Sequence, residues 1–293
     1  MQSTVTFDSD GLKLTGTLHV PEAMAAGERR PALLVLHGFG VNRASGTSVA
    51  AARLFEQWGY VALRFDFRGC GDSEGTPGHL LCLDQVADTR NALAWLATRA
   101  EVDPARIGVF GHSFGAAVAV YAGGEDPRFA AVISSCGWGD GERKFRGQHA
   151  GAAAWARFTA MLEEGRAHRA RTGASLMVPR WDIVPIPEHL RANLPAGSIN
   201  EFPVETAQSM FDFRPDERVG RIAPRPLLLF HAANDSVTPS EQTLGLYARA
   251  GHPTDLVLLD DIDHFPFADT NPRAKGVLRG WLDRYFPALP AGA

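Results

Sequence analysis

Short, uninterrupted apolar runs recur along this chain, and helical patterns separate them. The runs cover residues 32–36, 60–65, 107–110, 130–133, 226–230 and 255–259. A strand that is apolar at every position, rather than at every second one, is typical of a parallel sheet covered on both faces. Because such runs alternate with helical segments at 50–58, 83–97, 116–122, 241–250 and 272–285, the sequence predicts a doubly wound, mostly parallel α/β sheet.

The opening of the chain follows a different period. Between residues 12 and 20, Leu12, Leu14 and Leu18 alternate with polar side chains. A period of two predicts a half-buried strand, which we expect to pair as an antiparallel edge hairpin with residues 5–7.

One long stretch interrupts the alternation of strands and helices. Residues 138–222 show no parallel-strand pattern, but they contain a helix-like piece at 152–165 and a loop-like, proline-rich piece at 178–187. An interruption of this length is unlike a plain loop in a compact domain. We therefore predict an α/β core formed by residues 1–137 and 223–293, with residues 138–222 as an inserted cap over one end of the sheet.

Charge and cysteine content exclude several classes of protein. The formal net charge of −4 indicates no nucleic-acid partner. No apolar run approaches the ~18 residues of a membrane span, and residues 1–22 do not resemble a secretion signal. Cys70, Cys82 and Cys136 form no C-x-x-C pair and are interpreted as reduced thiols. These features together predict a cytoplasmic protein without a membrane partner.

The pattern G-x-S-x-G, which can carry a nucleophilic serine, occurs twice, at 71–75 and at 111–115. The chemistry needs a sharp turn from a strand into a helix, which lifts the serine hydroxyl above the sheet. Ser113 follows an apolar run and precedes a helix of small residues, whereas Ser73 lies in a glycine-rich turn with no helix after it. Ser113 is therefore the candidate nucleophile, and Ser73 is interpreted as a turn residue.

A serine hydroxyl needs a general base, and the base needs a carboxylate to orient it. His264 is the histidine that follows the last apolar run, and Asp235 follows the run before it. Three other carboxyl groups, those of Asp260, Asp261 and Asp263, are close to the histidine in sequence. Neighbours along one strand end rarely face the same ring nitrogen, so Asp235 is the stronger candidate for the acid.

Acyl transfer also needs donors for the negative charge that develops on the carbonyl oxygen. The backbone N–H of Phe114, directly after the nucleophile, is one candidate donor. The other is the backbone N–H of Phe39, in the His-Gly-Phe-Gly segment that follows the apolar run at 32–36.

These motifs together resemble the α/β-hydrolase superfamily, and within it the bacterial carboxylesterases related to feruloyl esterases and the dienelactone-hydrolase-like proteins. The matching segments are residues 37–40, 66–73, 111–115, 234–239 and 263–265. The resemblance implies a catalytic triad of Ser113, Asp235 and His264. Dienelactone hydrolases proper carry cysteine as the nucleophile, so serine at this position favours hydrolysis of an ester or a thioester.

Substrate contacts are expected in the predicted cap. Its aromatic residues Trp138, Trp155, Phe158 and Trp181 indicate an aromatic or apolar ester, unless they form the core of the cap itself. The cap also holds a basic run, which would steer an anionic ester or else be a solvated helix face. Its members are Arg143, Lys144, Arg146, Arg157, Arg166, Arg169 and Arg171.

The sequence thus predicts a serine hydrolase that cleaves a small-molecule carboxylic ester. No H-E-x-x-H and no G-x-G-x-x-G opening a helix after a strand is found, so no metal and no cofactor are expected. The same triad would also serve carbon–carbon bond hydrolysis, acyl transfer or amide hydrolysis, and a non-catalytic binding protein is a further alternative. An exposed edge strand or the cap surface would suit a homodimer.

Overall fold

A computed structural model describes residues 1–22, 24–25, 27–267 and 271–288. Residues 268–270 and 289–293, which belong to the predicted second part of the core, lie outside the described residues. The main sheet has eight strands in the order β1-β2-β4-β3-β5-β6-β9-β10. They are β1 (Gln2–Ser9), β2 (Leu12–His19), β3 (Arg30–Leu36), β4 (Val61–Phe65), β5 (Val102–His112), β6 (Phe129–Ser135), β9 (Leu227–Ala232) and β10 (Thr254–Leu259).

The sheet confirms the predicted mixture of a parallel core and an antiparallel edge. Strands β4, β3, β5, β6, β9 and β10 run parallel to one another. β1 pairs with β2 in an antiparallel hairpin that sets Phe7 opposite Leu14, and β2 pairs antiparallel with β4. The period-two segment therefore forms the edge, where one face of the strand is solvated.

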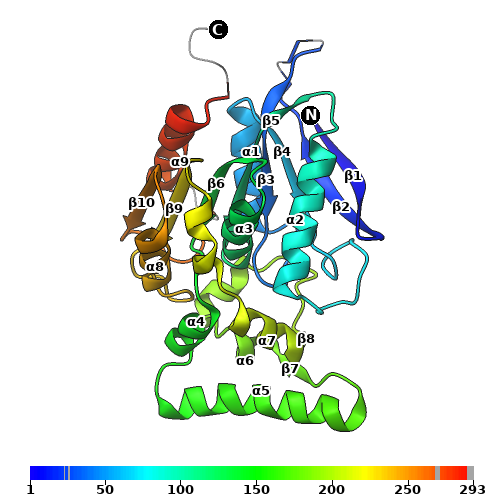
Figure 1. The fold of residues 1–293 in the computed structure, drawn as a ribbon, viewed down its shortest axis with the longest axis vertical. Helices are drawn as coiled ribbons and strands as arrows, with labels where there is room; N and C mark the ends of the chain where they lie inside the picture. Colours follow the sequence, from blue (N-terminus) through cyan, green and yellow to red (C-terminus); the bar gives the residue numbers. More distant parts are fainter. Residues whose placement is uncertain (23, 26, 268–270, 289–293) are drawn as a thin grey trace.

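Helices on both faces of the sheet explain the uniform apolar runs. Leu33 and Val35 of β3 pack in one hydrophobic cluster with α1 and α9, whereas Leu34 and Leu36 pack in the other with α2 and α3. Both faces are visible in Figure 1, where the helices flank the strands. The helices of the core are α1 (Gly46–Gln57), α2 (Cys82–Leu96), α3 (Phe114–Glu125), α8 (Glu241–Arg249) and α9 (Pro272–Tyr285).

The segment between β6 and β9 forms a separate group of elements at the carboxyl end of the parallel strands, with the long helix α5 lying across the lower end of Figure 1. The group consists of α4 (Gly141–Gln148), α5 (Ala152–Thr172), β7 (Met177–Pro179), α6 (Arg180–Ile183), η1 (Glu188–Asn193), β8 (Glu201–Pro203), α7 (Val204–Asp212), η2 (Pro215–Glu217) and η3 (Val219–Arg221).

Two predictions for this segment need correction. The helix predicted at 152–165 continues to Thr172 and ends where Gly173 adopts a left-handed conformation with φ of +74°. The proline-rich piece at 178–187 is not all loop, since it contains the short helix α6. Proline fits there because Pro179 precedes the first helical residue and no intrahelical hydrogen bond is lost.

Other expectations concern membranes and thiols. In the part of the chain that the structure describes, no helix combines the length and the apolar character needed to cross a membrane. Cys70, Cys82 and Cys136 are all buried and free, as predicted.

Candidate active site

Ser113 occupies a strained turn between β5 and α3. Its φ of +56° and ψ of −116° are unusual for a residue with a side chain. The turn is tight enough to require glycine on both sides, since a Cβ at Gly111 would collide with the carbonyl oxygen of Gly115. A Cβ at Gly115 would in turn lie 2.6 Å from the carbonyl oxygens of Leu36 and His37. This nucleophile-elbow geometry is absent at Ser73, whose hydroxyl donates to the carbonyl oxygen of Asp66 at 2.6 Å.

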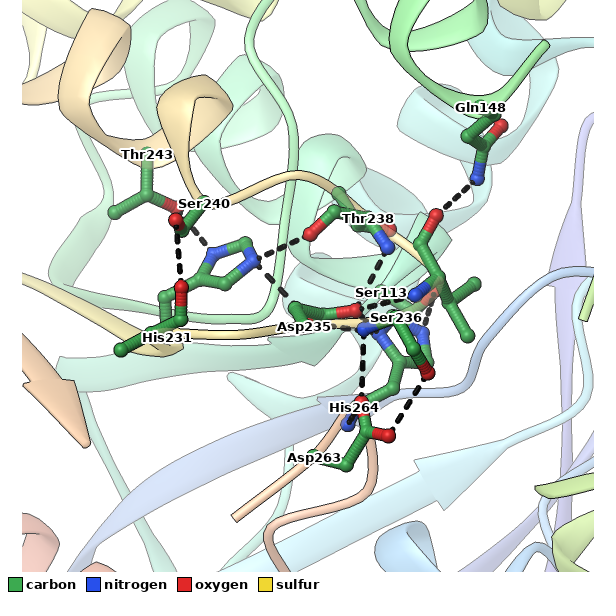
Figure 2. A network of polar contacts seen from close by, with 12 residues as sticks. Ser113, Gln148, His231, Asp235, Ser236, Thr238, Ser240, Thr243, Asp263 and His264 are labelled. Carbon is green, nitrogen blue, oxygen red and sulfur yellow. Dashed lines mark hydrogen bonds and ion pairs between the residues drawn. The ribbon is translucent and has the colours of Figure 1, made fainter. Parts of the chain in front are cut away.

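The structure brings the three predicted side chains together in one hydrogen-bonded chain (Figure 2). The Oγ of Ser113 lies 2.9 Å from Nε2 of His264. The Nδ1 of His264 lies 2.9 Å from Oδ2 and 3.0 Å from Oδ1 of Asp235. Asp235 follows β9, and His264 follows β10, so adjacent parallel strands deliver acid and base to the same edge of the sheet. In this arrangement Nδ1 donates to the carboxylate and Nε2 accepts the serine proton.

Asp235 is held as a carboxylate. Its side chain is fully buried, which alone would raise its pKa, but the nearby His264 and hydrogen bonds from His231 and His264 hold the pKa well below its usual range. The backbone N–H groups of Val237 and Thr238 also donate to Oδ1, at 2.8 and 2.7 Å. A carboxylate with this many donors stays ionised at neutral pH.

His231 is a residue of this network that the sequence analysis missed. Its Nε2 lies 3.0 Å from the carbonyl oxygen of Thr238 and 3.3 Å from Oδ2 of Asp235, and its Nδ1 lies 2.6 Å from the hydroxyl of Thr243. A carbonyl oxygen can only accept, so Nε2 carries the proton and Nδ1 accepts from Thr243. The available signal was its position four residues before Asp235, at the end of the same strand.

Asp263, one of the alternative acids, has a different position. Its carboxylate accepts from the backbone N–H and the hydroxyl of Ser236, at 2.9 and 2.8 Å, and from the backbone N–H of His264 at 2.7 Å. It therefore ties the loop of Asp235 to the loop of His264 without facing the imidazole ring (Figure 2). This is the geometric reason why a neighbour in sequence does not take the place of Asp235.

The loop that holds Phe39 lies beside the elbow. A Cβ at Gly38 would be only 3.7 Å from Cβ of Ser113. His37 shapes this loop, because its Nδ1 donates to the carbonyl oxygen of Gly38 at 2.8 Å and its Nε2 accepts from the backbone N–H of Phe67 at 3.2 Å. Within the described residues, the backbone N–H groups of Phe39 and Phe114 donate to no protein acceptor. Both predicted oxyanion donors are thus free.

A small cavity of about 40 Å³ adjoins Ser113. Residues of the α/β core line it together with residues of the segment between β6 and β9, here called the insertion (residues 138–222). The aliphatic residues of the lining are Val41, Val184, Ile186, Leu194 and Val237. Phe39 and Phe265 add aromatic surface, and Arg180 adds a positive charge. No aspartate or glutamate occurs in the lining, as far as the structure describes it.

The four aromatic residues predicted as substrate contacts are absent from this lining. Phe158 stacks on Phe145 with ring centroids 4.5 Å apart, and Trp155 packs against Phe158 at 5.8 Å. Trp138 is buried against Phe213, at 5.6 Å. Trp181 lines a different hollow, of about 470 Å³, together with Phe158. The burial of Trp138 and Phe158 favours the alternative left open above, that these rings form the core of the insertion. Trp155 and Trp181 are only half-buried.

The predicted basic run does not form one surface patch. Arg146 pairs with Glu142, Arg169 pairs with Glu205, and Arg143 lies 3.5 Å from Asp216. Lys144 is buried, with its Nζ 3.8 Å from the ring centroid of Phe145. Arg166 donates to Gln208, whereas Arg157 and Arg171 are exposed. Only part of the run is therefore paired or buried, and the attraction of an anionic ester by this run stays a prediction.

The buried Lys144 predicts that the folding stability of the protein depends on pH. Burial lowers the pKa of Lys144 from 10.5 to about 7, and no side chain or backbone group in the described part of the chain accepts a hydrogen bond from its Nζ. Below pH 7 both the folded and the unfolded chain carry the charge, and folding bears the full cost of burying it. Between about pH 7 and 10.5 the unfolded chain binds the extra proton, so stability rises with pH.

Lys144→Met is therefore expected to raise the melting temperature by ~5 °C at pH 6, and the gain should shrink toward zero by pH 10.5. Calorimetric melting curves across this pH range provide the measurement. Arg157→Met is the matched control, because Arg157 is exposed on the adjacent helix and its replacement should change little at any pH. A gain for Lys144→Met that did not vary with pH would contradict the buried-charge explanation.

One group of side chains at the site has the ligand types that could hold a metal ion. Among the described residues, the group of histidine, cysteine and acidic side chains close enough to hold a metal ion is Cys136, Asp235 and His264. Asp235 and His264 are bonded to each other, and burial raises the pKa of the Cys136 thiol well above its usual range. The donor set therefore offers no thiolate at neutral pH and suits the hydrogen-bonded triad better than a metal.

Several known proteins resemble this chain. The alignment with the quorum-quenching protein AidA of Acinetobacter baumannii is 36% identical over 138 residues, which are 47% of this chain and 44% of that protein. The acyltransferase drtE of Aspergillus calidoustus is 28% identical over 285 residues, covering 90% of this chain and 89% of that protein. The crystal structure of the α/β hydrolase GrgF from a Penicillium species superimposes with a TM-score of 0.80 at 23% identity, covering 97% of this chain and 99% of that one.

Fold and comparisons together show that the protein has the α/β-hydrolase fold. More specifically, the chain belongs to the X-Pro dipeptidyl-peptidase (S15) family, whose model matches residues 10–265. The match spans both parts of the core and the insertion between them. The protein is thus a hydrolase by family.

Proposed function

We propose that this protein cleaves a carboxylic ester through an acyl-enzyme on Ser113. The observation that carries the proposal is the continuous path from Oγ of Ser113 to Nε2 of His264 and from Nδ1 of His264 to Asp235, each step at 2.9 Å. The path supports the proposal because it gives the serine a base, and the base an orienting carboxylate, without any rearrangement.

In the proposed mechanism, His264 takes the proton of Ser113 as Oγ attacks the ester carbonyl carbon. The free N–H groups of Phe39 and Phe114 donate to the carbonyl oxygen, which becomes negative in the tetrahedral intermediate. The ester C–O bond then breaks, and His264 returns its proton to the departing alcohol. Water repeats the sequence on the acyl-serine and releases the carboxylic acid, which leaves Ser113 protonated as at the start.

The cavity at Ser113 supports a short acyl group. The cavity is small, about 40 Å³, and its lining is mainly aliphatic. Hydrophobic burial rewards each methylene that fits, by ~0.8 kcal/mol, whereas a chain longer than the cavity must displace residues of the insertion.

With p-nitrophenyl esters, we therefore expect kcat/KM to be highest for acetate or butyrate and to fall at least ~10-fold for decanoate. The measurement is the initial rate of p-nitrophenol release, paired with labelling of Ser113 by a fluorophosphonate probe. A preference for decanoate would contradict the short acyl pocket. Labelling without turnover of any ester would keep the nucleophile and reject the ester, and carbon–carbon and amide substrates would then be tried.

Removal of an X-Pro dipeptide, the reaction in the family's name, receives less support. Such a substrate presents a protonated amino terminus, which a buried site must match with a negative charge. The described lining of the cavity at Ser113 instead holds the cation of Arg180 and no carboxylate. The same argument favours substrates that are neutral or anionic near the reacting carbonyl.

Acyl transfer is the second candidate, and one feature favours it. The apolar side chains of Val184, Ile186 and Leu194 from the insertion enclose the site, which would limit the access of water to an acyl-serine. The relation to the acyltransferase drtE points the same way. If added alcohols raised p-nitrophenol release and appeared as new esters in preference to the free acid, transfer would be the principal reaction.

We also propose that residues 138–222 act as a cap over the site. Gln148 of α4 donates to the carbonyl oxygen of Val237 at 2.6 Å, and thus joins the insertion to the loop of Asp235 (Figure 2). The cavity lining drawn from both units supports the same proposal. The three free buried thiols support a reducing compartment such as the cytoplasm.

A further inference from the structure

Arg180, at the start of α6, is a fully buried cation whose hydrogen bonds all go to backbone carbonyl oxygens. Within the described residues no carboxylate pairs with it, although it lines the cavity at Ser113. Burial lowers the pKa of Arg180 to about 10, so the guanidinium is still charged at neutral pH. Burying a charge without a counter-ion is costly, so the position calls for an explanation.

The guanidinium forms hydrogen bonds to the loop that carries the candidate oxyanion donor, the backbone N–H of Phe39. Its Nη1 donates to the carbonyl oxygen of Phe39 at 2.8 Å, and its Nη2 donates to the carbonyl oxygen of Gly40 at 2.7 Å. Its Nε donates to the carbonyl oxygen of Ile199 at 2.7 Å, which anchors the side chain within the insertion. A planar, forked donor of this kind fixes two consecutive carbonyl groups at once, which a lysine cannot do.

These bonds constrain the direction of the Phe39 N–H from one side, and His37 constrains it from the other. The N–H of Phe39 and the carbonyl of Gly38 belong to one planar trans peptide, so they point in opposite directions. His37 holds that carbonyl at 2.8 Å, and Arg180 holds the next two carbonyls along the chain. The Phe39 N–H is thereby left pointing away from its bonded neighbours, with no acceptor of its own among the described residues.

The close packing around Gly40 independently indicates that the loop is shaped to accept the hydrogen bonds from Arg180. Gly40 has φ of +54°, and a Cβ there would lie 2.8 Å from Nη2 of Arg180 and collide with the ring of Phe202. The ring of Phe202 also stacks on Phe39, with centroids 4.4 Å apart. The loop therefore approaches the arginine more closely than a residue with a side chain would allow.

We propose that Arg180 is a positioning residue of the oxyanion hole, which the insertion supplies to the core. It fixes the Phe39 N–H toward the carbonyl oxygen under attack, and its unpaired positive charge favours the oxyanion over the neutral ester. The inference rests on the proposed acyl-enzyme chemistry at Ser113. It predicts an effect on the transition state rather than on substrate binding.

The test compares Arg180→Gln and Arg180→Lys with wild type, on the best p-nitrophenyl ester and on two ketones with the same acyl group. The trifluoromethyl ketone adds Oγ of Ser113 and forms an oxyanion, whereas the methyl ketone binds as a ground-state analogue. For Arg180→Gln we expect kcat to fall ~100-fold with KM within ~3-fold, and the trifluoromethyl ketone to bind ~100-fold more weakly. The methyl ketone should bind almost unchanged, and Arg180→Lys should lose ~10-fold in kcat because it keeps the charge but not the fork.

Arg225→Gln is the matched control. Arg225 also donates to backbone carbonyls, those of Gly123, Asp126 and Phe129, but it lies away from the site. Its replacement should lower the melting temperature without changing kcat or ketone affinity. A purely structural role for Arg180 would give the same pattern.

The inference is overturned if Arg180→Gln folds and binds the trifluoromethyl ketone as wild type does. If that variant does not fold, Arg180→Lys decides by the same criterion, with an unchanged kcat and ketone affinity overturning the inference. Failure of the proposed function would look different, because wild type itself would then neither hydrolyse esters in a Ser113-dependent way nor bind the trifluoromethyl ketone tightly.

Discussion

Replacing Ser113 with alanine is expected to lower kcat on p-nitrophenyl esters by at least ~1000-fold, because the residues of a triad act as a unit and the loss of one disables the others. Alanine keeps the Cβ and the backbone of the elbow, so the fold should be retained. The hydroxyl that lies 2.9 Å from Nε2 of His264 is the group removed. The assay is steady-state kinetics, with fluorophosphonate labelling and a melting curve on the same preparation.

Ser73→Ala is the matched control, since Ser73 is the central residue of the second G-x-S-x-G pattern. Its hydroxyl donates to the carbonyl oxygen of Asp66 and accepts from the backbone N–H of Thr15, at 2.6 and 2.9 Å. We expect a loss of stability of about 1 kcal/mol and kcat within ~2-fold of wild type. Equal activities of Ser113→Ala and wild type would remove the nucleophile and, with it, the proposed function.

Asp235→Asn is expected to lower kcat by ~10⁴-fold, through the wrong imidazole tautomer. The asparagine oxygen would keep the N–H groups of Val237 and Thr238, which now donate to Oδ1. The amide NH₂ would then face the ring of His264, and Nδ1 would have to accept. The proton would move to Nε2, which could no longer take the proton of Ser113.

Asp260→Asn is the control for this variant. Asp260 and His264 both follow β10, but Asp260 is exposed and lies near Arg273. The kcat of Asp260→Asn should therefore stay within ~2-fold of the wild-type value. The tautomer change itself can be observed, because ¹⁵N chemical shifts distinguish a protonated Nε2 from a protonated Nδ1. If Asp235→Asn retained more than a tenth of the activity, the acid would have to be sought elsewhere, first at Asp263.

The insertion contributes residues to the candidate site. It contributes Val184, Ile186 and Leu194 to the cavity, and it contributes Arg180 to the loop of Phe39. Specificity within this fold is commonly set by such additions to a shared core. In this chain, residues outside the α/β core supply the charge of Arg180 and part of the lining of the cavity at Ser113.

The core and the positions of the candidate triad residues could be predicted from sequence because their signals are local. Uniform apolar runs report strands buried on both faces, and G-x-S-x-G reports an elbow that only glycine at 111 and 115 can form. Strand ends of a parallel sheet meet at one edge, so Asp235 and His264 were expected there before any distance was known. The order serine, acid, histidine along the chain then indicated which role each residue would have.

The other features of the site depend on contacts between segments that are remote in sequence. His231 and Asp263 each look like one polar residue among several near a strand end, and only the hydrogen bonds to Thr238 and Ser236 distinguish them. From sequence alone, the aromatic residues of the insertion fit either substrate contacts or a local core. Only the structure shows that Phe158 packs on Phe145 and that none of the four predicted residues lines the cavity at Ser113. Arg180 meets Phe39 across 141 positions of the chain. Local sequence patterns determined the architecture and the reacting groups, whereas the cavity and its charge were decided by tertiary packing, because burial and pairing are properties of neighbours that the sequence does not place.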